Sequence, residues 1–376
     1  MVRKFQYGLL VVAATIFMFS CNNQTKKKPE ATEVVEEVID TITVTDSLTH
    51  VQTKVIYDTV YIKVKSKKET VKEKAPSLSA WSPEKRKKIE RFVKSVSDKG
   101  SKSYLNPADR IAVFDNEGTL WPEQPVYFQL EFMFDRIKAM AKDHPEWKKD
   151  KLIQAVLNDD IKKIKRYGGQ GLFKLSQITQ SGMTTEEYRK IVLDWINKAK
   201  HPETGKRYRD MVYLPMSQLI DYLKHYHFKV FLVTEGGSGF LSPWSEQVFG
   251  IPPEYILASL RRLEYTEQDG KHVLIRDPEI LYINNDENKV ISIEQRIGKR
   301  PVVAFGNSDS DIPMLEWTSE NQHKHLVGII HHTDAQREWA YDKDTKIGKL
   351  SKGLKLAQDK GWMVVDMKND WKKIYH

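Results

Sequence analysis

The sequence predicts an α/β protein: a doubly wound, Rossmann-like parallel sheet core with an inserted helical cap subdomain. Five short apolar segments alternate with segments of helical spacing, as in parallel sheets whose two faces are covered by helices. They are "RIAVFD", "FKVFLV", "RPVVAFG", "HLVGIIHH" and "WMVVDM". Roughly 90 residues of mostly helical pattern separate the first two, although one crossover helix needs only about a dozen. The excess predicts a helical cap at residues 123–211.

Local signals place the other elements. Ser82 is a natural helix N-cap and Pro83 suits the first helical position, so a helix is expected to begin there. Thr184, with a glutamate three residues later, predicts a capped helix over "TTEEYRKIVLDWINKA". "NKVISIEQRI" has helical spacing. Asp269 and Gly270 predict the turn of a hairpin within "YILASLRRLEYTEQDGKHVLI".

Composition limits the class of protein. The chain has 376 residues, of which 40% are hydrophobic and 30% charged, enough to bury a sizeable core. A net charge of +9 is compatible with a nucleic acid, an anionic membrane surface or an anionic substrate as partner. No run of Lys and Arg alternates with aromatic residues in a recognisable nucleic-acid module, so no nucleic-acid partner is expected. The single cysteine excludes an internal disulfide.

The first 21 residues have the layout of a signal peptide. Arg3 and Lys4 precede an apolar run at 8–19, and Ser20 precedes Cys21, the one cysteine of the chain. The run is too short for a comfortable transmembrane helix. The segment resembles a bacterial lipoprotein signal, although "MFSC" departs from the commonest lipobox, and a plain secretory signal or an uncleaved anchor is the alternative. The resemblance implies acylation of Cys21, attachment to a membrane of the bacterial cell envelope, and a folded region outside the cytoplasm.

Residues 22–79 differ in composition from residues 80–376. They are rich in Thr, Val, Lys and Glu and contain no Gly, Trp or Phe. This composition predicts a spacer between the membrane and the folded region, while a small packed β-domain is the alternative that the low aromatic content disfavours. The expected organisation is a lipoprotein signal (1–21), a spacer (22–79), an α/β core (80–122 and 212–376) and a helical cap (123–211).

Polar side chains lie directly after the predicted strands. Asp115, Glu117 and Thr119 come after the first strand. Thr234 ends the second strand, and Glu235 then leads into glycine-rich backbone and the start of a helix. A hydroxyl, free N–H groups and a helix N-terminus suit a phosphate group. Because ligands of open parallel sheets bind at the carboxyl ends of the strands, these residues are expected to share one site.

A third strand end carries Asn307, Asp309 and Asp311, and Lys289 stands at the start of the helix before that strand. Each feature is weak alone, but together and in this order they resemble the haloacid dehalogenase superfamily of phosphohydrolases over residues 80–376. Within that superfamily, "FDNEGTLW", "GNSDSD", "MLEWT" and "HHTDAQRE" are similar to motifs of bacterial hydrolases described as phosphoserine-phosphatase-like.

The resemblance implies a Mg²⁺-dependent phosphatase that acts on a small-molecule phosphate monoester. Asp115 would be the nucleophile that forms an aspartyl-phosphate, which requires an ionised oxygen held in line with the leaving group. Mg²⁺ prefers about six oxygen ligands. The expected protein ligands are the Asp115 carboxylate, the backbone carbonyl of Glu117 and the side-chain oxygen of Asn307, with Asp311 either as a ligand or as a support.

The resemblance also implies which residues bind the phosphoryl group. They are expected to be Thr119, Thr234, Glu235, Gly236 and Lys289. Thr234 and Lys289 are counted among the catalytic residues, because Lys289 would also offset the charge of the neighbouring carboxylates.

Glu117 departs from the aspartate that the family usually has at this position. Its expected role is to protonate the leaving oxygen and then to deprotonate the attacking water. The side chain is one methylene longer, and a misplacement of about 1 Å can cost on the order of 100-fold in rate. A slow enzyme, a non-catalytic phosphate-binding lipoprotein, or phosphotransfer to another acceptor is therefore the alternative. Dehalogenation is disfavoured, because it needs neither Mg²⁺ nor a phosphate cradle around Thr234.

Two other stretches lie near these motifs. In "WPEQP", Glu123 is expected to meet a substrate amine. In "HHTD", the adjacent His331 and His332 should point to opposite faces of a strand, so they are expected to shape the loop beside the site without sharing a metal ion.

Overall fold

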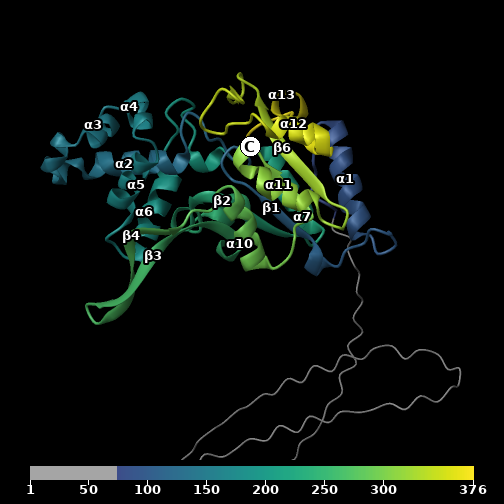
Figure 1. Cartoon of the computed structure of the whole chain (residues 1–376), viewed down its shortest axis with the longest axis horizontal. Helices are drawn as coiled ribbons and strands as arrows, with labels where there is room; N and C mark the ends of the chain where they lie inside the picture. The colour runs from purple at the N-terminus through teal and green to yellow at the C-terminus, as the bar shows by residue number, and fades with distance from the viewer. Residues whose placement is uncertain (1–73) are drawn as a thin grey trace, which may run out of the picture. The chain divides into compact units, whose positions relative to one another are not determined.

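A mostly parallel β-sheet forms the centre of the computed structural model, which describes residues 74–376 (Figure 1). The strand order is β4-β3-β2-β1-β5-β6-β7, and β8 pairs with β6. β4 and β7 run antiparallel to their neighbours, and the other strand pairs are parallel. This topology confirms the predicted α/β class. The strands are β1 (Ile111–Phe114), β2 (Lys229–Gly237), β3 (Ile256–Gln268), β4 (Lys271–Tyr282), β5 (Val303–Gly306), β6 (Leu326–Thr333), β7 (Ala340–Tyr341) and β8 (Met363–Asp366).

Alternating side chains give the sheet two buried faces. In β1, Ile111 and Val113 belong to one hydrophobic cluster and Ala112 and Phe114 to another, because successive side chains of a strand point to opposite faces. The first cluster includes side chains of α10, α11 and α12, and the second includes side chains of α1, α7 and α13. Helices therefore cover both faces, as predicted. Their bounds are α1 (Pro83–Ser97), α7 (Leu214–His225), α10 (Glu287–Ile297), α11 (Ile312–Ser319), α12 (Gly353–Lys360) and α13 (Met367–Asp370).

The chain between β1 and β2 is largely helical. The predicted capping box at the start of α6 is present, since Thr184 and Glu187 exchange side-chain to backbone hydrogen bonds. A separate cap at 123–211 stays a prediction, because the described residues 74–376 all belong to one compact unit. The helices of this segment that precede α7 are α2 (Phe128–Met140), η2 (Ala141–Asp143), η3 (Pro145–Lys149), α3 (Lys151–Leu157), α4 (Ile161–Arg166), α5 (Gly168–Gln180), α6 (Thr185–Lys198) and η4 (Tyr208–Asp210).

The strands β3 and β4 form the predicted hairpin, which extends away from the sheet beside α5 and α6 (Figure 1). Its turn residues, Asp269 and Gly270, have φ angles of 50° and 71°, which a two-residue hairpin turn requires. Two backbone hydrogen bonds join Arg276 of the hairpin to the segment between α5 and α6: Gly182 N–H donates to its carbonyl at 2.8 Å, and its N–H donates to Met183 at 2.9 Å. The hairpin and the helical segment are thus held together.

The two ends of the described chain are joined to each other. Trp81 and Trp371 form an antiparallel bridge, and their rings pack edge to face with centroids 6.1 Å apart. Backbone hydrogen bonds of 2.7 and 2.8 Å between residues 80–82 and 370–372 flank this bridge. Leu78 is 2% exposed and belongs to the core. The packed region therefore begins before residue 80, where the composition changes.

The predicted signal at 1–21, with Cys21, and the spacer up to residue 73 lie outside the described residues. Within residues 74–376, every helix is too short or too polar to cross a membrane. The remaining short helices are α8 (Ser238–Leu241), α9 (Ser245–Phe249), η1 (Pro107–Asp109), η5 (Pro253–Tyr255) and η6 (Asp309–Asp311).

Candidate active site

The predicted site residues meet where the strand order of the sheet reverses. From β1 the chain proceeds to β2 and β3 on one side, and later returns to β5 on the other side of β1. Asp115 comes directly after β1, and Asn307 comes directly after β5. The Asp115 N–H donates to the carbonyl of Phe305 at 2.9 Å, which fixes the end of β1 against β5. Such switch points are where ligands of open α/β sheets bind.

One buried lysine joins two buried carboxylates. Lys289 Nζ lies 2.6 Å from Asp115 Oδ1 and 2.5 Å from Asp311 Oδ1, and these side chains are 7% exposed or less. Burial raises the pKa of Asp115 well above its ordinary value, and the Asp311 charge raises it further against the opposing effect of Lys289. Burial alone would lower the pKa of Lys289, but the two carboxylates outweigh burial and raise it. Lys289 therefore stays charged.

Asp311 supports its neighbours with both carboxylate oxygens. Oδ1 accepts from Lys289, and Oδ2 accepts from the N–H groups of Asn307 and Ser308 at 3.0 and 3.1 Å. The Ser308 hydroxyl donates to the same oxygen. Of the two roles expected for Asp311, this geometry favours the support. Asp309 instead accepts backbone N–H groups at residues 351–353, so its carboxylate anchors a turn.

The Thr119 hydroxyl lies close to an oxygen of Asp115 and an oxygen of Asn307. Thr119 Oγ1 lies 3.2 Å from Asn307 Oδ1 and 3.5 Å from Asp115 Oδ2. Glu123 fixes the orientation of the Asn307 amide, because the amide Nδ2 donates to Glu123 Oε1 at 2.6 Å. Tyr341 donates its hydroxyl to the same Glu123 oxygen at 2.8 Å. Glu123 is 2% exposed and its Oε1 accepts two hydrogen bonds, but its residue belongs to the cavity wall, so its contact with a substrate amine stays a prediction.

The loop after β1 requires a glycine at position 118, between Glu117 and Thr119. Gly118 has a φ of +76°, and an added Cβ would lie 2.0 Å from the Asn307 amide nitrogen. Its carbonyl is 2.8 Å from His332 Nε2, whose other ring nitrogen is 3.1 Å from Glu338. Tyr213 donates to the second oxygen of Glu338 at 2.6 Å. A buried chain of three side chains thus holds the loop.

The two adjacent histidines lie in different surroundings, as their places on a strand predicted. His332 is 2% exposed beneath the loop, whereas His331 is half-buried and 3.9 Å from Asp342. The "HHTDAQRE" motif was the available signal for His332 and Glu338. Nothing in the sequence pattern pointed to Tyr213 or Tyr341.

The Glu117 carboxylate contacts the predicted phosphate-binding threonine. Thr234 donates its hydroxyl to Glu117 Oε2 at 2.7 Å and accepts the Gly236 N–H at 2.9 Å. The next N–H, of Gly237, donates to Gln129 Oε1 at 2.8 Å. The strand was expected to end at Thr234, but β2 continues to Gly237. The prediction of free N–H groups after Thr234 is wrong for Gly236 and Gly237, because side-chain oxygens of the chain itself accept from them.

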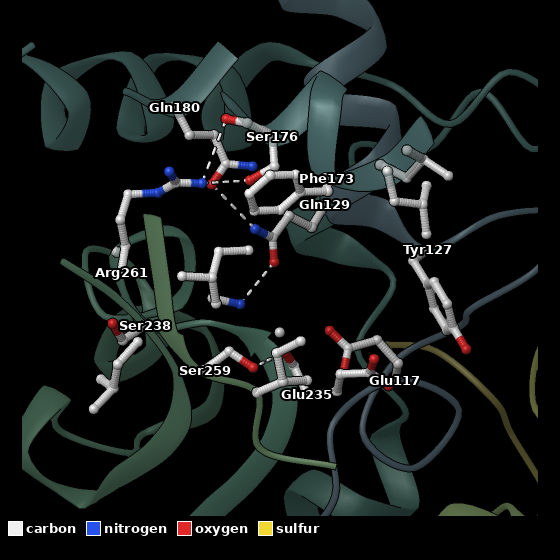
Figure 2. A pocket seen from close by; sticks show the side chains of 18 of the residues that line it. Glu117, Tyr127, Gln129, Phe173, Ser176, Gln180, Glu235, Ser238, Ser259 and Arg261 are labelled. Atoms are coloured by element: carbon white, nitrogen blue, oxygen red, sulfur yellow. Dashed lines mark hydrogen bonds between the residues drawn. The ribbon is translucent and has the colours of Figure 1, made fainter. Parts of the chain in front are cut away.

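A cavity of about 310 Å³ lies above this cluster. Asp115, Glu117 and Lys289 belong to its wall. Figure 2 shows Glu117 and Glu235 on one side of the cavity and Arg261 on the opposite side. The volume is at the low end for small-molecule sites, which run from about 300 to 1,000 Å³. Of the predicted residues, the cavity wall includes Asp115, Glu117, Glu123, Glu235, Gly236 and Lys289, and it does not include Thr119, Thr234, Asn307 or Asp311.

The oxygen ligands predicted for Mg²⁺ fit the observed geometry. Within residues 74–376, no group of three or more His, Cys, Asp or Glu side chains is arranged to hold a metal ion. The predicted set, however, contains one carboxylate, one carboxamide and one backbone carbonyl. Asp115 and Asn307 direct oxygens to the Thr119 hydroxyl, and oxygen donors of this kind suit Mg²⁺.

Several solved structures are similar to this chain. A protein of unknown function from Bordetella pertussis Tohama I is 18% identical, with 69% of this chain and 98% of that chain covered and a TM-score of 0.45. A conserved protein of unknown function from Anaerococcus prevotii DSM 20548 is 14% identical, with 68% and 87% covered and a TM-score of 0.46. For a phosphoserine phosphohydrolase-like protein from Francisella tularensis subsp. tularensis SCHU S4 the identity is 16%, the coverage 59% and 87%, and the TM-score 0.32.

Comparison with curated proteins found no match. A family model described as haloacid dehalogenase-like hydrolase matches residues 112–316, more than half of the chain. The matched range contains the ends of β1, β2 and β5 and the buried Lys289 between its two carboxylates. The protein therefore belongs to the haloacid dehalogenase-like hydrolase family.

Proposed function

We propose that the protein is a Mg²⁺-dependent phosphatase that hydrolyses a small-molecule phosphate monoester through an aspartyl-phosphate. One observation carries the proposal: Asp115 lies in the wall of the cavity, and the buried Lys289 holds its carboxylate in place. A carboxylate held in this way can attack a bound substrate, and the ammonium beside it attracts the phosphoryl group. Membership of the hydrolase family supports this reaction class.

The proposed reaction has two steps. In the first, an Asp115 oxygen attacks phosphorus, the bond from phosphorus to the ester oxygen breaks, and Glu117 gives its proton to the leaving alcohol. In the second, water attacks the aspartyl-phosphate, Glu117 takes a proton from that water, and inorganic phosphate leaves. Asp115 and Glu117 thereby return to their starting states. Glu117 lines the same cavity and is half-buried, so its carboxylate is accessible to the ester oxygen in the first step and to the attacking water in the second.

The oxygens of Asp115 and Asn307 and the backbone carbonyl of Glu117 would hold Mg²⁺, which when bound would neutralise charge on the phosphoryl group. Glu123 fixes the Asn307 amide so that its oxygen, and not its nitrogen, faces Asp115. Lys289 keeps its positive charge between the two aspartates and would also contact the phosphoryl oxygens.

A second candidate is a slow or non-catalytic phosphate-binding protein. The observation that favours it is the 2.7 Å hydrogen bond from Thr234 to Glu117, because that hydroxyl was predicted to bind phosphate. Phosphate binding at Thr234 would then require Glu117 to turn away. Binding of inorganic phosphate by a wild-type chain that hydrolyses phosphate esters slowly or not at all would distinguish this candidate from the phosphatase.

We also propose that Cys21 is acylated and attaches the chain to a membrane of the cell envelope, with the folded region outside the cytoplasm. The signal-like pattern of residues 1–21 supports this. Cys21→Ser is expected to release the chain from the membrane fraction or leave its signal uncleaved, and labelled fatty acid should appear on the wild type alone. Equal labelling of both chains would exclude the anchor.

The test of the enzymatic proposal uses the full chain with nitrophenyl phosphate and a panel of alkyl phosphates. Release of phosphate is expected with Mg²⁺ and should stop when the metal is chelated and resume when it is restored. A rapid acid quench should trap an acid-stable, base-labile phosphoryl group on the protein. Absence of hydrolysis for every ester, with or without Mg²⁺, would contradict the phosphatase and leave the binding candidate.

A further inference from the structure

The side of the cavity opposite Asp115 carries two arginines from one hairpin. Arg261 lies on β3 and Arg276 on β4, and both belong to the cavity wall. Burial lowers the pKa of each guanidinium, for Arg276 to about 10, and the Arg261 charge adds to the shift of Arg276. Two positive charges are thus held close together beside the cavity.

Neither arginine forms an ion pair within residues 74–376, although the nearby Asp277 charge raises the pKa of Arg261 against the effect of burial. Arg261 donates to the carbonyls of Asp277 and Pro278 at 2.8 Å and to the Ser176 hydroxyl at 2.5 Å. Arg276 donates its Nε–H to the Gln180 carbonyl at 2.7 Å, and its guanidinium lies 3.7 Å from the centre of an aromatic ring, that of Tyr188. Arg276 is 6% exposed and Arg261 is half-buried, and a buried cation is costly unless it is paired.

The cavity wall beside the two arginines contains hydrogen-bond donors that have no acceptor in the described part of the chain. The Nε2 of Gln180 is buried and has no hydrogen-bond partner within the described part of the chain, although Gln180 lines the cavity. The hydrogen bond of Arg276 uses Nε, and no acceptor among residues 74–376 pairs with its two terminal nitrogens. Hydrogen-bond donors without an acceptor, beside two positive charges, favour the binding of an anionic oxygen group.

The surface between the two ends of the cavity is apolar. Leu172 and Phe173 of α5 line it and are 39% and 42% exposed, and Leu260 of β3 lines it and is 41% exposed. Gln129 stands between the two ends, with hydrogen bonds to Gly237 on one side and Gln180 on the other (Figure 2). A hydrocarbon chain would cover these exposed side chains.

We propose that the substrate is a phosphate monoester whose alcohol part is apolar beside the ester and ends in an anionic oxygen group, a carboxylate or a second phosphate, that Arg261 and Arg276 bind. The proposal rests on the phosphatase function, which places the ester phosphate at Asp115. The guanidinium fork matches both oxygen groups in geometry. The exposed side chains of Leu172, Phe173 and Leu260 favour a hydrocarbon over a sugar-like alcohol, whose hydroxyls would face them.

The test measures binding, so it does not depend on turnover. Hexylphosphonate and its analogue with a terminal carboxylate are titrated into the full chain by calorimetry. The wild type is expected to bind the carboxylate analogue at least about tenfold more tightly, the size expected for charge-assisted hydrogen bonds in a buried site. An analogue with a terminal phosphonate separates the two sources of the anionic group. Equal affinity for hexylphosphonate and both charged analogues would overturn the proposal.

Matched variants locate the effect. Arg261→Gln and Arg276→Gln should each reduce the preference for a charged end at least about threefold. Arg262→Gln is the control, since Arg262 is exposed and pairs with Glu279 at 3.0 Å outside the cavity wall, and it should keep the wild-type preference. Thermal unfolding checks that each variant is folded, and the ligand comparison on the wild type stands even if one is not. A preference that survives in both folded variants would also overturn the proposal.

The same ligands separate the two proposals. A wild type that prefers the charged phosphonates but hydrolyses none of the corresponding phosphate esters keeps the anionic subsite and contradicts the phosphatase. Hydrolysis of alkyl phosphates without any preference for a charged end keeps the phosphatase and contradicts the subsite.

Discussion

The two ends of the cavity differ in how their charges are balanced. At the strand ends, Asp115, Lys289 and Asp311 are buried together, and each is held by another charged side chain. At the hairpin, Arg261 and Arg276 are held by carbonyls, a hydroxyl and an aromatic ring, with no acid. The chain supplies its own counter-charges where chemistry is proposed, and it leaves positive charge unmatched where recognition is proposed. The reacting end is therefore preorganised, and the other end depends on the charge of the ligand.

Removing the nucleophile should have the largest effect at the reacting end. Asp115→Asn keeps the shape of the side chain but removes the charge that attacks phosphorus. Phosphatase activity should fall at least about 1,000-fold, the order lost with a covalent nucleophile. Initial rates on nitrophenyl phosphate measure this, with Asp359→Asn at an exposed position as the control. More than a few per cent of the wild-type rate would exclude Asp115 as the nucleophile.

Removing Lys289 should leave the charges of Asp115 and Asp311 unbalanced. Lys289→Met leaves two buried carboxylates without a counter-charge, which should cost about 3–5 kcal/mol in the free energy of unfolding. Lys299→Met is the matched control, since its pair with Asp109 is exposed and should contribute less than about 1 kcal/mol. Urea denaturation at neutral pH compares the two. Equal losses would mean that the buried cluster stabilises no more than a surface ion pair.

Glu117 tests whether the reacting end moves a proton. Glu117→Gln should slow alkyl phosphates by roughly 100-fold in the phosphorylation step, because an alkoxide needs a proton to leave. Nitrophenyl phosphate should be slowed far less in that step, since nitrophenolate leaves without one. Single-turnover rates separate this step from hydrolysis of the aspartyl-phosphate. Rates equal to the wild type for both ester classes would make Glu117 a bystander and assign the proton transfer to another group.

Glu131 of α2 is a partly buried carboxylate in the helical segment, away from the cluster around Lys289. Burial raises its pKa to about 7 from its ordinary value of 4.5, and Asp135 adds to the shift against Lys138. A carboxylate whose folded pKa is raised costs stability as pH rises from about 4.5 to 7, because the unfolded chain ionises first. Glu131→Gln should therefore stabilise the fold by roughly 1–3 kcal/mol at pH 8 and little at pH 4.5. Urea denaturation at both pH values measures it, with exposed Glu254→Gln as control; a pH-independent difference would contradict the shift.

The sequence predicted the features that local patterns control. Apolar runs placed β1 and β5 and hence Asp115 and Asn307 at adjacent strand ends, and side-chain capping placed the starts of α1 and α6 at Ser82 and Thr184. The topology of parallel strands then brought Lys289 to the same point. These features depend on residues close in sequence or on rules that hold for the whole fold class.

Contacts between distant residues without a periodic pattern could not be predicted. The Asn307 amide is oriented by Glu123, 184 residues away, and Tyr213 reaches Glu338 across 125 residues. The pairing of the Gly236 N–H with Thr234 depends on a rotamer choice that composition does not reveal. The packing of Arg261 against Ser176 of α5 and of Arg276 over the Tyr188 ring likewise joins distant parts of the chain.

The bridge between residues 80–82 and 370–372 has a mechanical consequence. Tension applied to the chain before residue 78 would reach the folded unit at Leu78 and this bridge, where the two backbone hydrogen bonds beside Trp81 and Trp371 and the contacts of residues 80 and 81 with α7 share the load. The opposing segment lies next to the C-terminus, so the load passes from one end of the unit to the other without crossing the sheet.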